Sequence, residues 1–220
     1  MKKKRNTLRL IWISLFSSVI VLAGCQSVTH RPSDAALPAH TLRACGESFT
    51  LSGRVSLNYT LTQSGRTESL HGKFTWKQSE DSSQVALFSP LGQTMALIEV
   101  RPELAVFYAP GKEAVSAFDA DELLLGQIGW PLPISGLRHW LLGCMTEGDG
   151  TFLQASPLNP NLTTSDGWSV RYERWMPFGE DQLVPRRIDM SHTPLSPAPI
   201  TAIHIRLVAD EWAPSDKELP

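Results

Sequence analysis

Residue types that can carry catalysis are present, but their spacing forms no catalytic pattern. The sequence has six histidines and three cysteines, which could serve as bases, nucleophiles or metal ligands. His139 and Cys144 lie near the end of a predicted helix, and no third group is spaced to orient them, so we interpret His139 as a helix-end histidine. Zinc-protease, CxxC, nucleophile-elbow, phosphate-loop and dinucleotide patterns do not occur. The sequence predicts a protein that is not an enzyme and that needs no cofactor or metal.

The surroundings of Cys25 indicate another chemistry, covalent lipidation. The cationic segment Lys2–Arg5 precedes the apolar stretch Leu10–Leu22, which is the build of a signal peptide. Leu22-Ala23-Gly24-Cys25 then resembles the bacterial lipobox, whose cysteine carries S-diacylglycerol and N-palmitoyl groups. We predict that residues 1–24 are a signal peptide that is removed and that Cys25 is the lipid anchor. The alternative is an ordinary signal peptide followed by a chance cysteine.

The residue after this cysteine predicts the compartment. In lipoproteins of bacteria with two membranes, an aspartate there usually marks retention at the inner membrane, and here the residue is Gln26. Two or three acyl chains anchor firmly, whereas one chain holds only marginally. We therefore expect a protein lipid-anchored to the outer membrane on its periplasmic face.

Charge argues against nucleic acid as a partner. The formal net charge is −2, and Lys2–Arg5 and Arg9 fall in the segment predicted to be removed, which leaves a more acidic body. Binding to a phosphate backbone depends on clustered cations. The composition predicts an acidic body that binds no nucleic acid, and we expect the protein to be a monomer.

The two other cysteines, Cys45 and Cys144, lie in the part of the chain expected in an oxidising compartment, where thiols tend to pair. A disulfide requires Cα atoms within about 7 Å of each other. The sequence leaves both the paired and the free state open.

Alternating apolar residues predict a single mainly β domain over residues 41–220, after a lipidated flexible tether over residues 25–40 that is rich in Ser, Thr and Pro. In the second expected strand Phe74 and Trp76 share one face, and in the last one Ile203 and Ile205 do. We read 157–166 as a turn-rich loop and 192–199 as a loop or a sheet edge. The strands are expected at 49–61, 70–77, 84–88, 93–100, 104–108, 168–175, 186–190 and 200–208.

Two helices are expected between these strands. The segment 116–128 has acidic residues before its leucines, as a helix N-terminus favours, and Gly129 ends it. The segment 134–142 places Ile134, Leu137 and Leu141 on one face, and Gly143 ends it. An antiparallel sheet with one apolar face needs a cover, so we expect these helices to lie over it as a lid.

The turn Ser89-Pro90-Leu91-Gly92 combines good turn residues with an unusual apolar tip. On these residues alone, Leu91 is either an ordinary exposed or tucked leucine, or a finger that enters a membrane or a protein groove.

Several short motifs together resemble the LolB family. They are Phe74-x-Trp76, the turn at 89–92, Gly129-Trp130-Pro131-Leu132-Pro133, Leu137-Arg138-x-Trp140-Leu141-Leu142-Gly143 and Trp168-x-Val170-x-Tyr172. The resemblance runs in order from about Leu51 to Trp212. It implies an incomplete, half-open antiparallel β-barrel covered by short helices around an apolar cavity, which agrees with the antiparallel sheet and helical lid expected from the residue pattern.

The resemblance also implies a function. Family members take triacylated lipoproteins from the periplasmic carrier LolA and place them in the inner leaflet of the outer membrane, and the protruding leucine tied to insertion falls on Leu91. The alternative is a structural or assembly outer-membrane lipoprotein that binds a protein partner or another lipid ligand. From strand phase and helix faces we expect the acyl-chain cavity to be lined by Phe74, Trp76, Val85, Leu87, Leu97, Val106, Leu124, Ile128, Leu137, Trp140, Ile203 and Ile205.

Overall fold

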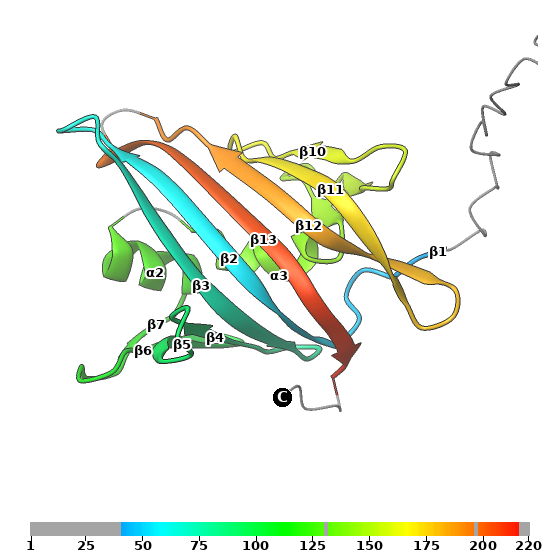
Figure 1. Cartoon of the computed structure of the whole chain (residues 1–220), viewed down its shortest axis with the longest axis horizontal. Helices are drawn as coiled ribbons and strands as arrows, with labels where there is room; N and C mark the ends of the chain where they lie inside the picture. The colour runs from blue at the N-terminus through cyan, green and yellow to red at the C-terminus, as the bar shows by residue number, and fades with distance from the viewer. Residues whose placement is uncertain (1–40, 130–131, 196–197, 216–220) are drawn as a thin grey trace, which may run out of the picture. The chain divides into compact units, whose positions relative to one another are not determined.

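The computed structural model describes residues 41–129, 132–195 and 198–215 (Figure 1). Cys25, the predicted signal peptide and the predicted tether lie outside these residues. The strands are β1 Thr41–Leu42, β2 Phe49–Leu61, β3 Thr67–Gln78, β4 Ser83–Phe88, β5 Thr94–Arg101, β6 Leu104–Tyr108, β7 Val115–Ala117, β8 Cys144–Thr146, β9 Phe152–Gln154, β10 Asn161–Thr163, β11 Ser169–Phe178, β12 Gln182–His192 and β13 Ile200–Pro214. The helices are α2 Ala120–Ile128 and α3 Ile134–Trp140.

One large sheet forms the frame of the domain. Its strands run in the order β10-β11-β12-β13-β2-β3-β4-β5-β6-β7, so β2 pairs with the last strand, β13. Strand β1 lies parallel to the start of β12, at Gln182 and Leu183. The outermost strands β10 and β7 are not paired with each other, and β8 and β9 form a separate ribbon. The barrel is therefore incomplete.

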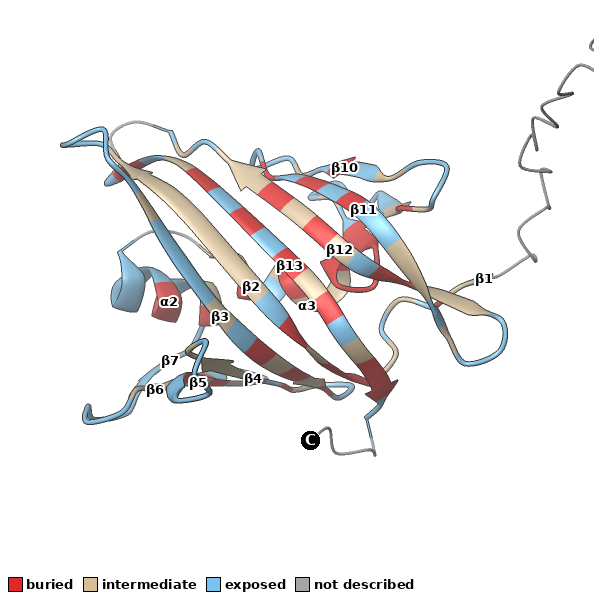
Figure 2. Cartoon of the chain, in the orientation of Figure 1, coloured by how far each residue is buried: buried red, intermediate tan, exposed pale blue. Residues whose placement is uncertain are grey.

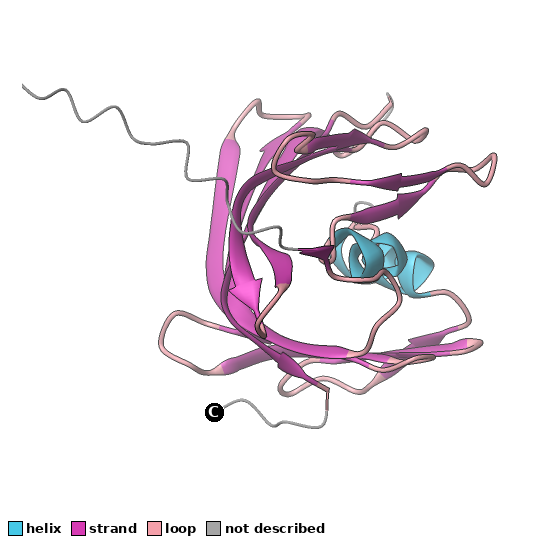
Figure 3. Cartoon of the chain, turned by 90° about the vertical axis from the view of Figure 1, so that its right-hand side faces the viewer, coloured by secondary structure: helices cyan, strands magenta, loops and turns pink. Residues whose placement is uncertain are grey.

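The sheet curves around the two helices. Figure 3 shows α2 and α3 on the concave side, enclosed by strands on three sides. Neighbouring strands twist relative to one another, and bulges in β13 and β11 increase the bend. The expected fold class, mainly β with a helical lid in a half-open barrel, is confirmed.

Side-chain alternation decides what the concave face contains. Phe74 and Trp76 of β3 are buried while Lys73 is exposed, and Ile203 and Ile205 of β13 are buried while His204 is exposed. Figure 2 shows this alternation along β13. Apolar residues of the long strands thus meet α2 and α3 in one continuous core.

The predicted helix 116–128 is four residues too long at its start. Ala117 pairs with Ala105 of β6, so this stretch is strand β7. The helix begins at Ala120, because Asp119 caps it by accepting a hydrogen bond from the backbone N–H of Glu122 at 2.8 Å.

The hairpin of β11 and β12 extends further than the prolines suggested. Pro177 and Pro185 both lie within strands, and Pro185 is paired with Trp175. Strand β12 pairs with β13 only from Arg187 onward, so the missing N–H of Pro185 interrupts no ladder on that side. The loop expected at 157–166 also contains a short strand, β10, which pairs with β11.

Candidate functional site

A hollow of about 170 Å³ opens on the concave side of the sheet. Strands β2 to β5 and β13 form its floor and sides, and Leu132 with the first residues of α3 closes it from above. The residues around it are Val55, Leu57, Leu70, His71, Gly72, Lys73, Phe74, Trp76, Val85, Leu87, Phe88, Met95, Ile98, Leu132, Ile134, Leu137, Ile205 and Leu207.

The wall of the hollow is almost wholly apolar. The indole Nε1–H of Trp76 is paired, because it donates a hydrogen bond to Oε1 of Gln78 at 3.1 Å. The same oxygen accepts from the hydroxyl of Ser83 at 2.6 Å, so this buried polar cluster is satisfied within itself. A surface of this kind can bind hydrocarbon, and the titratable residues beside it, His71 and Lys73, are exposed.

Half of the residues expected to line a cavity lie at this wall: Phe74, Trp76, Val85, Leu87, Leu137 and Ile205. Leu124, Trp140 and Ile203 are instead packed in the core, and Ile128 is on the exposed side of α2 with 36% of its surface accessible.

For two residues the expected orientation was wrong. Leu97 lies on the opposite face of β5 from Ile98, which is 2% exposed and lines the hollow. Val106 borders an outer groove together with Glu99 and Arg101. Glu99 and Arg101 share a face of β5 with Leu97, and these charges mark it as the outer face. Strand β6 is apolar on both faces, so its phase could not be predicted locally, and a shift of one residue reverses every side chain.

Sequence reasoning missed several residues of the wall. Val55 and Leu57 belong to the alternation recognised in 49–61, and Ile134 shares a helix face with Leu137. The alternation and the shared helix face would have been enough to predict these three residues as part of the wall. Leu70 alternates with Phe74 and Trp76, so the same signal applied to it. Met95 is out of phase with Ile98 and carried no such signal. Both lie at the rim and are about half exposed, at 49% and 47%.

The turn between β4 and β5 presents Leu91 to solvent. This side chain is 90% exposed. The turn itself is held by backbone hydrogen bonds from Ser89 N–H to the Gln93 carbonyl at 2.8 Å and from Gly92 N–H to the Ser89 carbonyl at 2.9 Å. Gly92 has φ 86°, a conformation that favours glycine. A fixed turn therefore carries an apolar tip away from the core.

Cys45 and Cys144 form a disulfide in the structure, with their Cα atoms 6.0 Å apart. The bond joins the segment between β1 and β2 to the chain that leaves α3. Cys144 is therefore no free thiol, and a Cys/His pair with His139 is absent from this site. Burial, together with neighbouring Arg138, lowers the pKa of His139.

The convex face is polar and carries ion pairs. Arg54 donates two hydrogen bonds to Asp210, and this contact raises the pKa of Arg54. Arg206 and Arg187 both contact Asp189, at 2.6 and 2.7 Å. The exposed pair of Arg54 and Asp210 contributes little to stability, whereas Arg187 and Asp189 are half-buried.

No group of three His, Cys, Asp or Glu side chains among the described residues is arranged to hold a metal ion. No helix in the described ranges has the length and apolarity needed to cross a membrane.

Comparison with known proteins gives a consistent result. The family model described as Outer membrane lipoprotein LolB matches residues 47–212. The chain is 34% identical over 206 residues to an outer-membrane lipoprotein LolB of Cupriavidus metallidurans, covering 90% of this chain and 92% of that one. It is 31% identical to the protein of that name from Nitrosococcus oceani, covering 90% and 94% of the two chains. A solved structure of a LolA superfamily protein from Nitrosomonas europaea is 14% identical, with a TM-score of 0.46 over 83% of this chain and 92% of that one.

Proposed function

The chain belongs to the LolB family of outer-membrane lipoproteins, and from that membership we propose that it receives lipoproteins by their acyl chains and places them in the outer membrane. The carrier LolA is the proposed donor, and a triacylated lipoprotein is the cargo. Cys25, which lies outside the described residues, is the proposed anchor that keeps the domain at the membrane.

The apolar hollow is the observation that carries this proposal. Moving an acyl chain of about 15 methylenes into water would cost on the order of 12 kcal/mol. A receptor that never exposes the chain to water avoids that barrier. The nearly polar-free wall between Trp76, Ile98 and Leu137 supports such a role. A difference of about 1 to 3 kcal/mol between donor and receptor would then be enough to direct the flow without a nucleotide.

The volume of the hollow limits how acyl chains can be taken up. Sites for drug-sized ligands measure roughly 300–1,000 Å³, whereas this hollow measures about 170 Å³. Several acyl chains therefore require the hollow to widen or the chains to extend over its rim. Leu70 and Met95, both about half exposed, give that rim an apolar surface.

Leu91 is the proposed group that contacts the membrane during delivery. Its side chain is almost fully exposed on a turn held by internal hydrogen bonds. An apolar tip enters lipid at no desolvation cost, whereas a carboxylate would have to be desolvated or protonated.

The test is transfer of a radiolabelled triacylated lipoprotein from purified LolA to the soluble body that starts after Cys25, followed by addition of liposomes. We expect the body to accept the lipoprotein and to deliver it. The Leu91→Glu variant should accept the cargo but fail to deliver it. Leu158→Glu is the matched control, since Leu158 is 98% exposed but lies in the loop between β9 and β10.

Two results would contradict the proposal. Normal delivery by Leu91→Glu would remove the role of the turn. Absence of any transfer to the body would remove the acyl-binding role, and the protein would then be a structural or assembly lipoprotein.

A further inference from the structure

Strand β3 has a partner along only half of one edge. On its β2 side it is paired from Thr67 to Gln78. On its β4 side the pairing covers only Lys73 to Gln78. Among the described residues, no strand therefore pairs with the β4 side of residues 67–72. All but Glu68 and Gly72 in this stretch are exposed, and Figure 2 shows the pale upper half of β3.

The pairing pattern shows which backbone groups face this open edge. The N–H of Leu61 donates to the carbonyl of Arg66, so these two residues form a hydrogen-bonded pair. In an antiparallel ladder such pairs alternate with non-hydrogen-bonded ones. Counting along the register, Thr67, Ser69 and His71 occupy the non-hydrogen-bonded positions toward β2. Their N–H and C=O groups consequently point away from β2, to the open side.

Strand β4 cannot extend to cover this edge. The register that pairs Lys73 with Phe88 would place Pro90 opposite His71, and proline has no N–H to donate. The N–H of the preceding residue, Ser89, points to the β5 side, where it donates to the carbonyl of Gln93, so the N–H that would have to pair with His71 is the one that Pro90 lacks. The edge is therefore left open by the same turn that presents Leu91.

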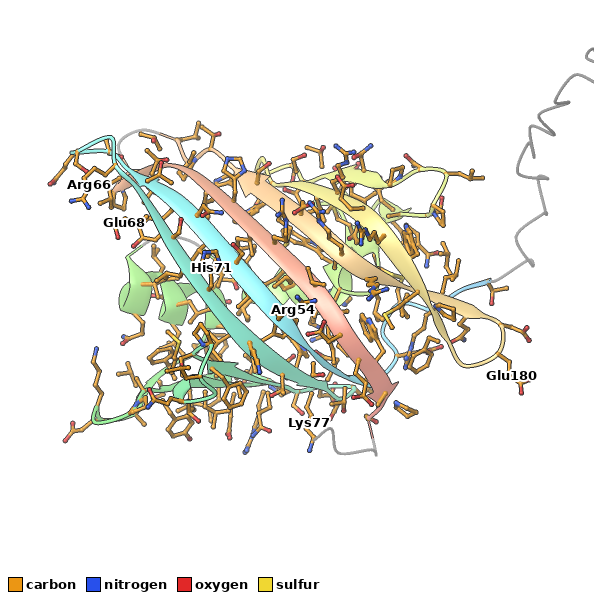
Figure 4. All side chains as sticks on the ribbon, viewed as in Figure 1. Arg54, Arg66, Glu68, His71, Lys77 and Glu180 are labelled. Atoms are coloured by element: carbon orange, nitrogen blue, oxygen red, sulfur yellow. A yellow bond between two sulfur atoms is a disulfide. The ribbon has the colours of Figure 1, made fainter. Side chains whose placement is uncertain are left out.

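The open edge borders the mouth of the hollow. His71, Gly72 and Lys73 line both the hollow and a second groove on the convex side, which also includes Pro90. Leu70, on the open stretch, lines the hollow as well. Figure 4 shows Arg66, Glu68 and His71 along this half of β3, from its turn down to the mouth.

We propose that residues 67–71 of β3 bind the peptide segment that follows the lipidated cysteine of the cargo, as an added β-strand. This inference rests on the proposed function. Acyl chains held in the hollow would bring the attached peptide to the mouth, next to the free N–H and C=O groups of Ser69 and His71. The covalent link makes this second contact intramolecular, so even a weak strand pairing would be populated.

Backbone pairing also fits a receptor for many cargoes. The N–H and C=O groups that Thr67, Ser69 and His71 direct to the open side are the same in any strand. They do not select a particular side chain of the bound peptide. The residues beside them on the concave face, Glu68 and Leu70, leave space open to solvent rather than a closed side-chain pocket. The edge would accept peptides of different sequence, and it would reject those whose N–H groups are removed.

The test uses synthetic triacylated lipopeptides with six residues after the acylated cysteine. One series carries backbone N-methyl groups at the second, fourth and sixth of these residues, and the other at the first, third and fifth. An added strand uses alternate N–H groups, so one series should bind the soluble body about tenfold more weakly and the other within about twofold of the unmethylated peptide.

A protein variant completes the design. Ser69→Pro removes an N–H that faces the open side, so it leaves the β2 ladder intact. It should bind both methylated series and the unmethylated peptide equally. Thr163→Pro is the matched control, because Thr163 lies on the edge strand β10 in a non-hydrogen-bonded pair next to the hydrogen-bonded pair of Thr164 and Trp168. This control should keep the difference between the two series.

The outcomes separate this inference from the proposed function. Equal binding of all three peptides to the native body would overturn strand addition while leaving acyl binding intact. No binding of any lipopeptide would overturn the proposed function itself. Concentration-dependent dimers that Ser69→Pro abolishes, without an effect of methylation, would assign the edge to a second copy of the chain and overturn the inference.

Discussion

The phenol of Tyr172 donates a hydrogen bond to the backbone carbonyl of Trp140 at 2.9 Å. Tyr172 lies on β11 and Trp140 is the last residue of α3, so the bond connects the sheet to the C-terminal end of the helix. That carbonyl also accepts a hydrogen bond from the backbone N–H of Gly143 at 2.9 Å, where the chain leaves the helix. The contact with Tyr172 adds a second bond from the sheet and fixes the helix whose first turn closes the hollow.

Removal of this hydroxyl should destabilise the domain. Tyr172→Phe removes one of the two hydrogen bonds that the Trp140 carbonyl accepts and leaves the one from Gly143 N–H, so we expect a loss of about 0.5–1.5 kcal/mol. Chemical denaturation should show a lower midpoint with an unchanged slope. Trp140 and Trp168 would remain in contact, since the ring of residue 172 is kept. An unchanged midpoint would mean that the bond adds nothing to the stability of the native state.

Tyr172 should also make the protein sensitive to high pH. Burial raises its pKa above the ordinary value of about 10. A raised pKa means that the folded state holds the proton more tightly than the unfolded state, so this contribution to stability is complete below pH 10 and is lost above it. The native protein should lose stability as the pH rises above 10, and Tyr172→Phe should lose less. Denaturation midpoints at pH 9 and 11 for both proteins would measure this difference.

The disulfide should contribute strongly to stability. Cys45 and Cys144 are separated by 99 residues in sequence, and closing a loop of that length restricts the unfolded chain by about 2–5 kcal/mol. The double variant Cys45→Ala, Cys144→Ala should melt about 5–15 °C lower in a domain of this size. Reductant should lower the melting temperature of the native protein and leave the variant unchanged. The same melting temperature for both proteins without reductant would show that the crosslink is not a source of stability.

A larger side chain in the hollow should block lipid without unfolding the domain. Val55→Phe places a ring at the wall, and we expect the affinity for a triacylated lipopeptide to fall by at least about tenfold, a change of about 1.4 kcal/mol. Val106→Phe is the matched control, because Val106 borders the outer groove on the other face of the sheet. Equal binding by both variants would show that the hollow is not the acyl site.

Two glycines should respond to alanine in opposite ways. At Gly53 of β2 an added Cβ would meet the carbonyl oxygen of Val208 on β13, so Gly53→Ala should force these strands apart and destabilise the domain by about 1–3 kcal/mol. Gly126 lies in α2 with open space around its Cβ position. Gly126→Ala should stabilise the helix by about 0.5–1 kcal/mol. Thermal melts would test both signs, and a neutral Gly53→Ala would contradict the close approach of β2 and β13.

Much of the fold was predictable because its signals are local. Alternation in 49–61 and 200–208 gave the strands that pair across the middle of the sheet, and the proline and glycine of 89–92 gave the turn that exposes Leu91. The apolar face of 134–142 gave α3. Each of these patterns depends on residues close together in the sequence.

Other features depend on contacts that no local pattern contains. The orientation of Val106 was decided by pairing with β5, where it lies opposite Glu99, because both faces of β6 are apolar. The pairing of Cys45 with Cys144 required the chain between β1 and β2 to reach the end of α3. The open edge at Ser69 and His71 exists because β4 ends at Phe88, where the register meets Pro90. The sequence by itself therefore determined the long strands, the helix α3 and the turn at 89–92, since backbone and side-chain preferences act over a few residues. Only the tertiary structure decided which faces enclose the hollow and which edge stays unpaired, since these follow from the register between distant strands.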